Sequence, residues 1–207
     1  RQSVSQIDAQ TYRVKFAGRP NKEFDVTKPS QTEMALYHGA ASSGNWSRAV
    51  GSWPLIFQQA QGLDRKAQTF SERNQFMSYS GNLPGEFSDN GGFPYEGLEL
   101  LTGKKFETLS LSHVKEPEKL GKLIEKSLES GAPMVASTLY SEKTGQSTPD
   151  GFNRNHAYAV IDFRADGPHE YVTLRDPHGP EATREVDLAT FSKNFSALSH
   201  ELKDGEN

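Results

Sequence analysis

The sequence contains no cysteine among its 207 residues. It can therefore form neither a disulfide bond nor a thiolate nucleophile of its own. No apolar run approaches the ~18 residues needed to cross a bilayer, and no signal-peptide pattern is present. The lack of cysteine does not assign a compartment, because reducing and oxidising environments both hold such proteins, so localisation is left unknown.

The sequence also lacks a large excess of either charge. It has 23 Lys and Arg residues and 27 Asp and Glu residues, for a net charge of −4. This balance argues against a nucleic-acid partner. A chain of this length can bury a sizeable core, and we expect one domain over residues 1–207, built as one lobe or as two lobes with a cleft between them. Residues 1–10 and 203–207 are expected to be polar tails. The first residue is Arg1, which suggests a processed chain or a fragment.

The apolar patterns predict an α+β fold. The clearest helix is expected over 117–130, where Leu120, Leu123, Ile124 and Leu128 share one face and Gly131 follows. A strand hairpin is expected over 11–27, from the alternating runs 11–16 and 23–27. Further helices are expected over 33–37, 53–60, 72–76 and 189–195, and one more is expected to contain Leu98 and Leu101 and to end at Gly103. Further strands are expected over 107–111, 133–140 and 196–202.

The stretch 153–163, followed by 171–179, has the composition of a β-hairpin. Its apolar residues have a period of two, and residues 164–168 supply turn chemistry, with Gly167 able to take a positive φ. A three-residue turn centred on Asp166 would place His156 directly opposite Asp176, with Cβ atoms about 4.5–5.5 Å apart. The alternation gives the first strand one apolar face, with Ala157, Ala159, Ile161 and Phe163.

An imidazole beside a carboxylate has a chemical use. The carboxylate fixes the tautomer of the imidazole and stabilises its protonated form, which prepares it as a general base. Two other interpretations stay open. The pair can be an ordinary surface contact, or it can bind zinc together with His178, although no His-Glu-x-x-His helix supports a metal site. No metal is predicted.

Two motifs carry a resemblance to a known family. The first motif has two segments, His-Ala-Tyr from His156 and Leu-Arg-Asp-Pro-His-Gly from Leu174. They resemble the segments that carry the catalytic His and Asn in calpain-type, papain-like cysteine proteases. The run from Asn90 to Gly103 resembles their Gly-Gly-aromatic-Pro substrate loop. The resemblance implies a papain-like fold whose antiparallel sheet carries the His/Asp pair. It further implies that His156 and Asp176 are catalytic residues and that an extended peptide is bound by Gly91, Gly92 and Phe93.

The sequence departs from the family's pattern at the site itself. Asp176 stands in place of Asn, His178 stands in place of Trp, and the nucleophilic cysteine is absent. The resemblance leaves two places for the nucleophile: upstream of Arg1, because a hairpin like 11–27 follows the cysteine-bearing helix in calpains, or at Ser52, which precedes Trp53 as the papain cysteine precedes its tryptophan. A plain helix cap is the favoured interpretation of Ser52.

Several functions remain open on the sequence. The first is a cysteine endopeptidase domain that is inactive as this chain alone. The second is an inactive protease-like domain that binds an extended peptide or a partner protein, and the third is an acyl transferase. The expected partners are a peptide or protein substrate, the cysteine-bearing N-terminal segment and an inhibitor protein. No cofactor is expected, and calcium is suggested by family analogy alone, since no EF-hand pattern occurs.

Overall fold

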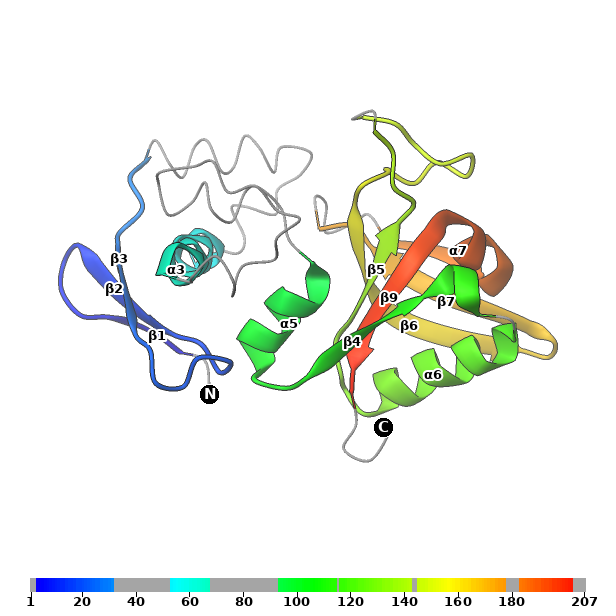
Figure 1. Cartoon of the computed structure of the whole chain (residues 1–207), viewed down its shortest axis with the longest axis horizontal. Helices are drawn as coiled ribbons and strands as arrows, with labels where there is room; N and C mark the ends of the chain where they lie inside the picture. Colours follow the sequence, from blue (N-terminus) through cyan, green and yellow to red (C-terminus); the bar gives the residue numbers. More distant parts are fainter. Residues whose placement is uncertain are drawn as a thin grey trace. The chain divides into compact units, whose positions relative to one another are not determined.

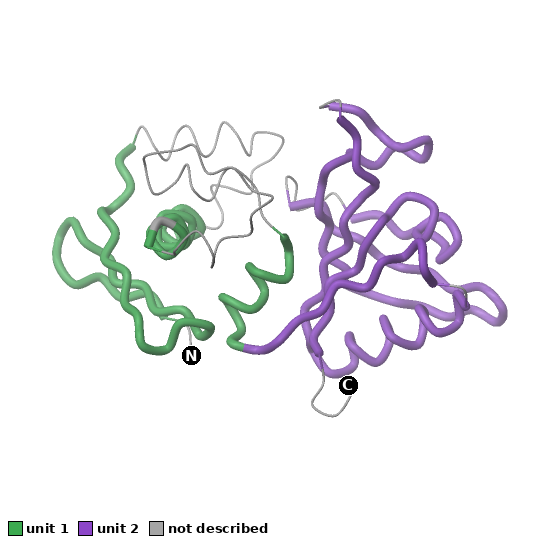
Figure 2. The backbone as a smooth tube through the Cα atoms, in the orientation of Figure 1, with its two compact units in different colours: residues 1–103 green, residues 104–207 purple. Residues whose placement is uncertain are grey.

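The computed structural model describes residues 3–31, 53–67, 93–114, 116–142, 145–177 and 183–202. The chain divides into two compact units, residues 1–103 and 104–207 (Figure 2). Each unit combines helices with an antiparallel sheet (Figure 1). The predicted α+β class is therefore confirmed.

Unit 1 contains a three-stranded sheet in the order β1-β2-β3. The strands are β1 (Ser3–Gln6), β2 (Thr11–Lys15) and β3 (Phe24–Thr27), and both pairings are antiparallel. The predicted hairpin is confirmed, but the description of residues 1–10 as a tail is wrong. The strand β1 pairs with β2, from Ser3 opposite Lys15 to Gln6 opposite Tyr12. The side chains of β1 are mostly polar and exposed, so the sequence shows no apolar alternation there.

Two described helices belong to unit 1, α3 (Trp53–Ala67) and α5 (Pro94–Thr102). The helix α3 continues past its predicted end, because Leu63 repeats the apolar face of Ala60 after Gly62. The helix α5 ends as predicted, at Gly103 with φ of +73°. The core of this unit joins sheet and helices through Val14, Phe16, Phe24, Val26, Ile56, Ala60 and Leu100. The helices expected over 33–37 and 72–76, and the Ser52 cap, lie outside the described residues.

Unit 2 contains a six-stranded sheet in the order β4-β9-β5-β6-β7-β8, with every pairing antiparallel. Its strands are β4 (Phe106–Ser110), β5 (Met134–Thr138), β6 (Ala157–Asp166), β7 (His169–Arg175), β8 (Thr183–Asp187) and β9 (Phe195–Glu201). The last strand in sequence, β9, thus lies between β4 and β5. The long β6–β7 hairpin stands out in Figure 1.

Two helices, α6 (Pro117–Glu129) and α7 (Leu188–Asn194), pack against this sheet and against each other. The predicted apolar face of α6 is confirmed, since Leu120 and Ile124 are buried, and Leu123 and Leu128 pack partly buried beside them. A short 3₁₀ helix, η1 (Leu111–His113), connects β4 to α6. The buried residues of unit 2 form one apolar cluster that joins the sheet to both helices, and the candidate site lies beside it.

Candidate functional site

The turn of the β6–β7 hairpin differs from the predicted one. The strands pair up to Asp166 opposite His169, so the loop has two residues, Gly167 and Pro168. Gly167 has φ of +59°, whereas proline holds φ near −65°. A positive φ at the first position only is the conformation of a type II′ turn. The predicted three-residue turn centred on Asp166 is therefore wrong.

A second irregularity changes the face that β6 presents to the core. The register shifts between Val160 and Asp162, which makes Ile161 the extra residue of a β-bulge. Tyr158 and Val160 are buried before the bulge, and Phe163 packs against the same core after it. The bulge thus moves the core-facing side from even to odd positions. Of the predicted apolar set, Phe163 packs against the core, whereas Ala157, Ala159 and Ile161 are not among the core residues.

His156 and Asp176 nevertheless come together. The last pair of the hairpin ladder is Ala159 opposite Arg175, so one further step places Tyr158, and not His156, opposite Asp176. Diagonal cross-strand neighbours remain within reach of long side chains. The His156 Nε2 lies 3.0 Å from the Asp176 Oδ1, so the predicted contact is present although the predicted register is wrong.

The geometry of this contact assigns different roles to the two ring nitrogens. A proton on Nε2, donated to Asp176, leaves the lone pair on Nδ1, where it can accept a proton from a nucleophile. The side chains of His156 and Asp176 are only 15% and 16% exposed, so water competes weakly for the contact. The arrangement can therefore act as an oriented general base.

The backbone of His156 is fixed by the end of β5. The Thr138 amide and Oγ1 both donate to the His156 carbonyl, at 2.9 and 3.0 Å. The His156 amide in turn contacts Thr138 Oγ1 at 3.0 Å. Just before it, Asn155 has φ of +54°, and its side-chain amide bonds both backbone groups of Ser141. These contacts hold the chain at the point where the imidazole leaves the backbone.

Sequence reasoning missed two residues of this site, Thr138 and Tyr158. The Tyr158 ring packs edge to face on the His156 imidazole, with centroids 4.9 Å apart. Burial raises the pKa of Tyr158, and the nearby negative charge of Asp176 raises it further, whereas the Asn153 amide acts in the opposite direction. The His-Ala-Tyr motif was the available signal for Tyr158. No pattern in the sequence pointed to Thr138.

The remaining predicted site residues are only partly described. Phe93 directly precedes α5, with its side chain partly exposed and its ring stacked on Tyr95 at 5.7 Å. Gly91, Gly92, Ser52 and His178 lie outside the described residues. Their predicted roles in peptide binding, as a replaced nucleophile or as a zinc ligand therefore stay predictions.

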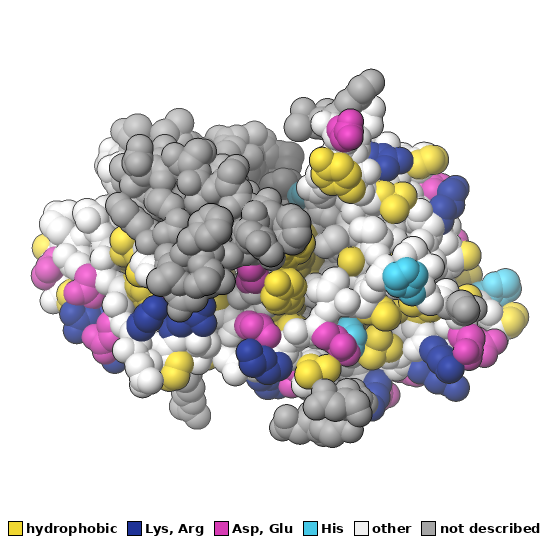
Figure 3. Space-filling model, viewed as in Figure 1, with side chains coloured by type: hydrophobic (Ala, Val, Ile, Leu, Met, Phe, Trp, Pro, Cys, Tyr) yellow, Lys and Arg dark blue, Asp and Glu magenta, His cyan; other side chains and the backbone are white. Residues whose placement is uncertain are grey.

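Metal-binding and membrane-spanning features are absent from the described part of the chain. No group of three or more His, Asp or Glu residues there is placed to hold a metal ion. No helix within the same ranges is long and apolar enough to span a bilayer. On the visible surface, charged side chains of both signs are interspersed (Figure 3).

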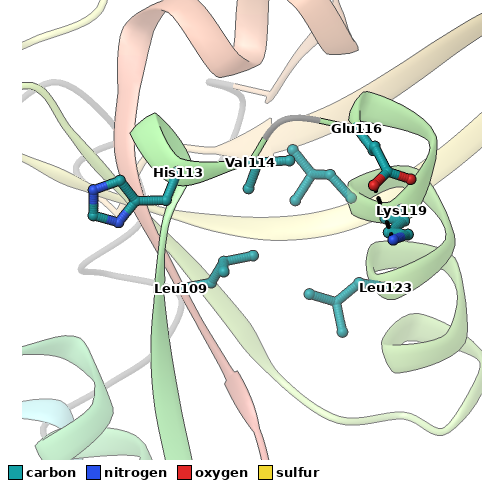
Figure 4. A pocket seen from close by; sticks show the side chains of 7 residues that line it. Leu109, His113, Val114, Glu116, Lys119 and Leu123 are labelled. Carbon is teal, nitrogen blue, oxygen red and sulfur yellow. Dashed lines mark hydrogen bonds and ion pairs between the residues drawn. The ribbon is translucent and has the colours of Figure 1, made fainter.

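Unit 2 also has a hollow of about 390 Å³ beside α6 (Figure 4). Its walls come from β4, η1 and α6 and are mainly apolar, with a Glu116–Lys119 ion pair of 3.0 Å. The lining residues are Leu109, His113, Val114, Glu116, Lys119, Leu120 and Leu123. None of them belongs to the His156–Asp176 site, so the hollow is a separate feature.

A comparison with known protein families covers the part of the chain that contains this site. The family model for the calpain family cysteine protease matches residues 81–205, which is more than half of the chain and includes both members of the pair. The chain therefore belongs to the calpain family of cysteine proteases, as its two motifs predicted. No curated protein matches it. The chain thus belongs to a family of cysteine proteases although it contains no cysteine.

Proposed function

We propose that this chain is the His- and Asp-bearing part of a cysteine-type endopeptidase domain with a papain-like fold. The observation that carries the proposal is the 3.0 Å contact between His156 Nε2 and Asp176 Oδ1 in a mostly buried setting. It is supported by the family match, which spans both residues. The substrate is then a peptide or protein, and the reaction is hydrolysis of a peptide bond.

In this proposal, His156 moves protons at its Nδ1 atom. Nδ1 takes the proton of the cysteine thiol, and the thiolate attacks the carbonyl carbon of the peptide bond. The same proton then passes to the leaving amine as the carbon–nitrogen bond breaks, which leaves an acyl-enzyme. His156 then takes a proton from water, whose oxygen attacks the thioester carbonyl. The carbon–sulfur bond breaks, the acid is released, and the proton returns from His156 to the cysteine sulfur.

Asp176 acts through the imidazole. Its carboxylate holds the proton on Nε2 and keeps the ring oriented, and its negative charge favours the imidazolium that forms between the two proton transfers. An asparagine in this position orients the ring without supplying a charge. The substrate side of the site is assigned to Gly91, Gly92 and Phe93, because a backbone without Cβ lets an extended peptide approach closely.

The nucleophile is the missing part, since the chain contains no cysteine. We propose that it is supplied by a segment N-terminal to Arg1, and that this chain alone does not hydrolyse peptides. The test is to sequence the natural coding region upstream of Arg1 and to assay the longer protein on fluorogenic peptides. Turnover that is lost in its Cys→Ala variant and in His156→Ala supports the proposal. Turnover that survives His156→Ala would overturn the assigned role.

Ser52 offers a second placement of the nucleophile that the same assay tests. The Ser52→Cys variant of this chain would gain peptide hydrolysis if Ser52 stands at the nucleophile position. We expect no gain, because the preferred interpretation of Ser52 is a helix cap. The matched control is Ser47→Cys, which places a thiol elsewhere in the same segment.

A second candidate function follows from the missing thiol. A protease-like domain without a nucleophile can bind an extended peptide, an inhibitor protein or another partner without turnover. This candidate predicts that peptide binding, measured by fluorescence anisotropy, persists in His156→Ala. If the natural upstream region contains no cysteine, the binding function replaces the peptidase function.

A further inference from the structure

We propose that Tyr158 is a positioning residue for the His156–Asp176 pair, which it joins to the backbone at Asn153. This inference rests on the proposed function and adds a third side chain to the site. The hairpin register provides the first argument, because the pair Ala159–Arg175 places Tyr158 opposite Asp176 at the next step. Asp176 thus has the imidazole on its diagonal and the phenol directly across.

The hydroxyl of Tyr158 has a defined orientation. Its oxygen accepts a hydrogen bond from the Asn153 amide at 3.2 Å. The phenol keeps one proton to donate, and the residue opposite Tyr158 in the hairpin register is Asp176, whose carboxylate is the acceptor in this proposal. The hydrogen bonds therefore run in one direction, from Asn153 through Tyr158 to Asp176.

The ring of Tyr158 cannot easily leave this position. It is 7% exposed and packs edge to face against Phe152 and Phe195, with centroids 5.6 Å away in both cases. Its own edge-to-face contact with His156, at 4.9 Å, fixes the imidazole plane. One rigid side chain thus contacts the imidazole through its ring. In this proposal it also contacts the carboxylate through its hydroxyl.

The chemistry of Asp176 explains why a hydroxyl donor suits this place. A carboxylate accepts hydrogen bonds on both oxygens and donates none. One oxygen of Asp176 faces the imidazole, and the side chain is mostly buried, so each further donor that reaches the carboxylate holds it more firmly. In this proposal the Tyr158 proton is such a donor, and it restricts rotation of the carboxylate away from His156.

The test uses Tyr158→Phe in the present chain, which removes only the hydroxyl. Nitrogen NMR of His156 reports which ring nitrogen carries the proton, and proton NMR reports how fast the Nε2 proton exchanges with water. We expect Nε2–H exchange to be about 3- to 10-fold faster in Tyr158→Phe, as befits the loss of one hydrogen bond. The matched control is Tyr171→Phe on the same hairpin, which should leave both signals unchanged.

An Asp176→Asn variant separates failure of this inference from failure of the proposed function. If Asp176→Asn alters the tautomer and exchange but Tyr158→Phe does not, the pair stands and the role of Tyr158 is overturned. If neither variant alters them, the proposed pair itself is overturned. Should Tyr158→Phe fail to fold, the Tyr158 titration in Asp176→Asn decides. Its pKa should fall towards that of an ordinary buried tyrosine, and an unchanged value would refute the contact.

The longer protein that contains the nucleophile provides a kinetic readout. A positioning role predicts that Tyr158→Phe lowers kcat and leaves KM unchanged, because the hydroxyl does not touch the substrate. A change in KM alone would contradict the inference.

Discussion

The two units of the molecule use different means to hold their elements together. In the described part of unit 2, fifteen buried residues form one apolar cluster between the sheet and its helices. In the described part of unit 1, seven buried residues do this work, and buried charges and close backbone contacts accompany them. Among the described residues, the candidate His/Asp pair lies in the unit with the larger apolar cluster, and the ring of Tyr158 packs on its imidazole.

The charged contacts of unit 1 illustrate the contrast. Asp64 is 1% exposed, and its carboxylate lies 3.2 Å from Arg19 and 3.6 Å from Lys22. Arg65, also buried, pairs with Glu96 on α5 at 3.0 Å. A buried carboxylate is tolerated only when it is paired with a positive charge. These contacts therefore fix which residues of unit 1 lie next to one another more than they add to its stability. Substitutions should therefore act differently in the two units.

The largest effect is expected in the apolar cluster of unit 2. Phe195 is 1% exposed and packs against the rings of Phe152 and Phe191, at 5.0 and 4.8 Å. Phe195→Ala should lower the free energy of unfolding by about 3–5 kcal/mol through lost burial and a cavity. Hydrogen exchange by mass spectrometry, followed unit by unit, should show the loss in residues 104–207. The exposed Tyr140→Ala is the control, and equal losses in both would refute the packing argument.

A smaller effect is expected from a close backbone contact in unit 1. The Gly18 amide donates to the Leu100 carbonyl at 2.9 Å, and a Cβ at residue 18 would lie 2.4 Å from the Glu99 carbonyl oxygen. Gly18→Ala should therefore destabilise unit 1 by about 1–3 kcal/mol, because backbone must move. Urea unfolding measures this loss.

The matched control for that experiment is Gly97→Ala. Gly97 lies within α5, and nothing lies within 4 Å of the Cβ that alanine would add. An alanine there should stabilise the helix by about 0.5–1 kcal/mol. A stabilising effect of Gly18→Ala would show that the β2–β3 loop and α5 are not in the contact described.

A third prediction concerns the start of α7 in unit 2. The Asp187 side chain accepts a hydrogen bond from the Thr190 amide at 2.8 Å, which lowers the pKa of Asp187. Asp187→Ala should reduce stability by about 1 kcal/mol at neutral pH, whereas Asp187→Asn keeps the cap.

The pH dependence of this cap has a definite sign. Because the pKa of Asp187 is lower in the folded chain, its contribution is present above the pKa of an unfolded aspartate and is lost as the pH falls through the folded value. The difference between the parent chain and Asp187→Ala should therefore shrink in acid. Thermal unfolding from neutral pH to about pH 3 measures it, and a difference that grows in acid would contradict the assignment.

The last prediction concerns the raised pKa of Tyr158, which affects the free energy of unfolding only in alkali. The unfolded chain releases the tyrosine proton at about pH 10, below the pH at which the folded chain does so. Stability should therefore fall as the pH rises above about 10, and it should fall less steeply in Tyr158→Phe. Chemical unfolding at pH 8 to 11 tests this, with Tyr171→Phe as the comparison. Parallel curves for the parent chain and Tyr158→Phe would refute it.

The sequence allowed the elements to be predicted better than their registers. The faces of α6 and the end of α5 follow from local spacing and from glycine, which a sequence displays directly. The bulge at Ile161 and the polar strand Ser3–Gln6 arise from backbone pairing, which leaves no side-chain pattern. The contact of His156 with Asp176 was predicted from a wrong register. It is present nevertheless, because residues two positions apart in a strand share a face, and a diagonal cross-strand neighbour is within reach.

The place of β9 in the sheet bears on how the chain is made. Residues 106–110 are synthesised well before residues 195–201, yet their strand joins the sheet only through β9, which those later residues form. Until β9 emerges from the ribosome, β4 and β5 each present an unpaired edge of the kind that promotes association between chains. A nascent or truncated chain that stops before residue 195 should therefore depend on chaperones and aggregate without them.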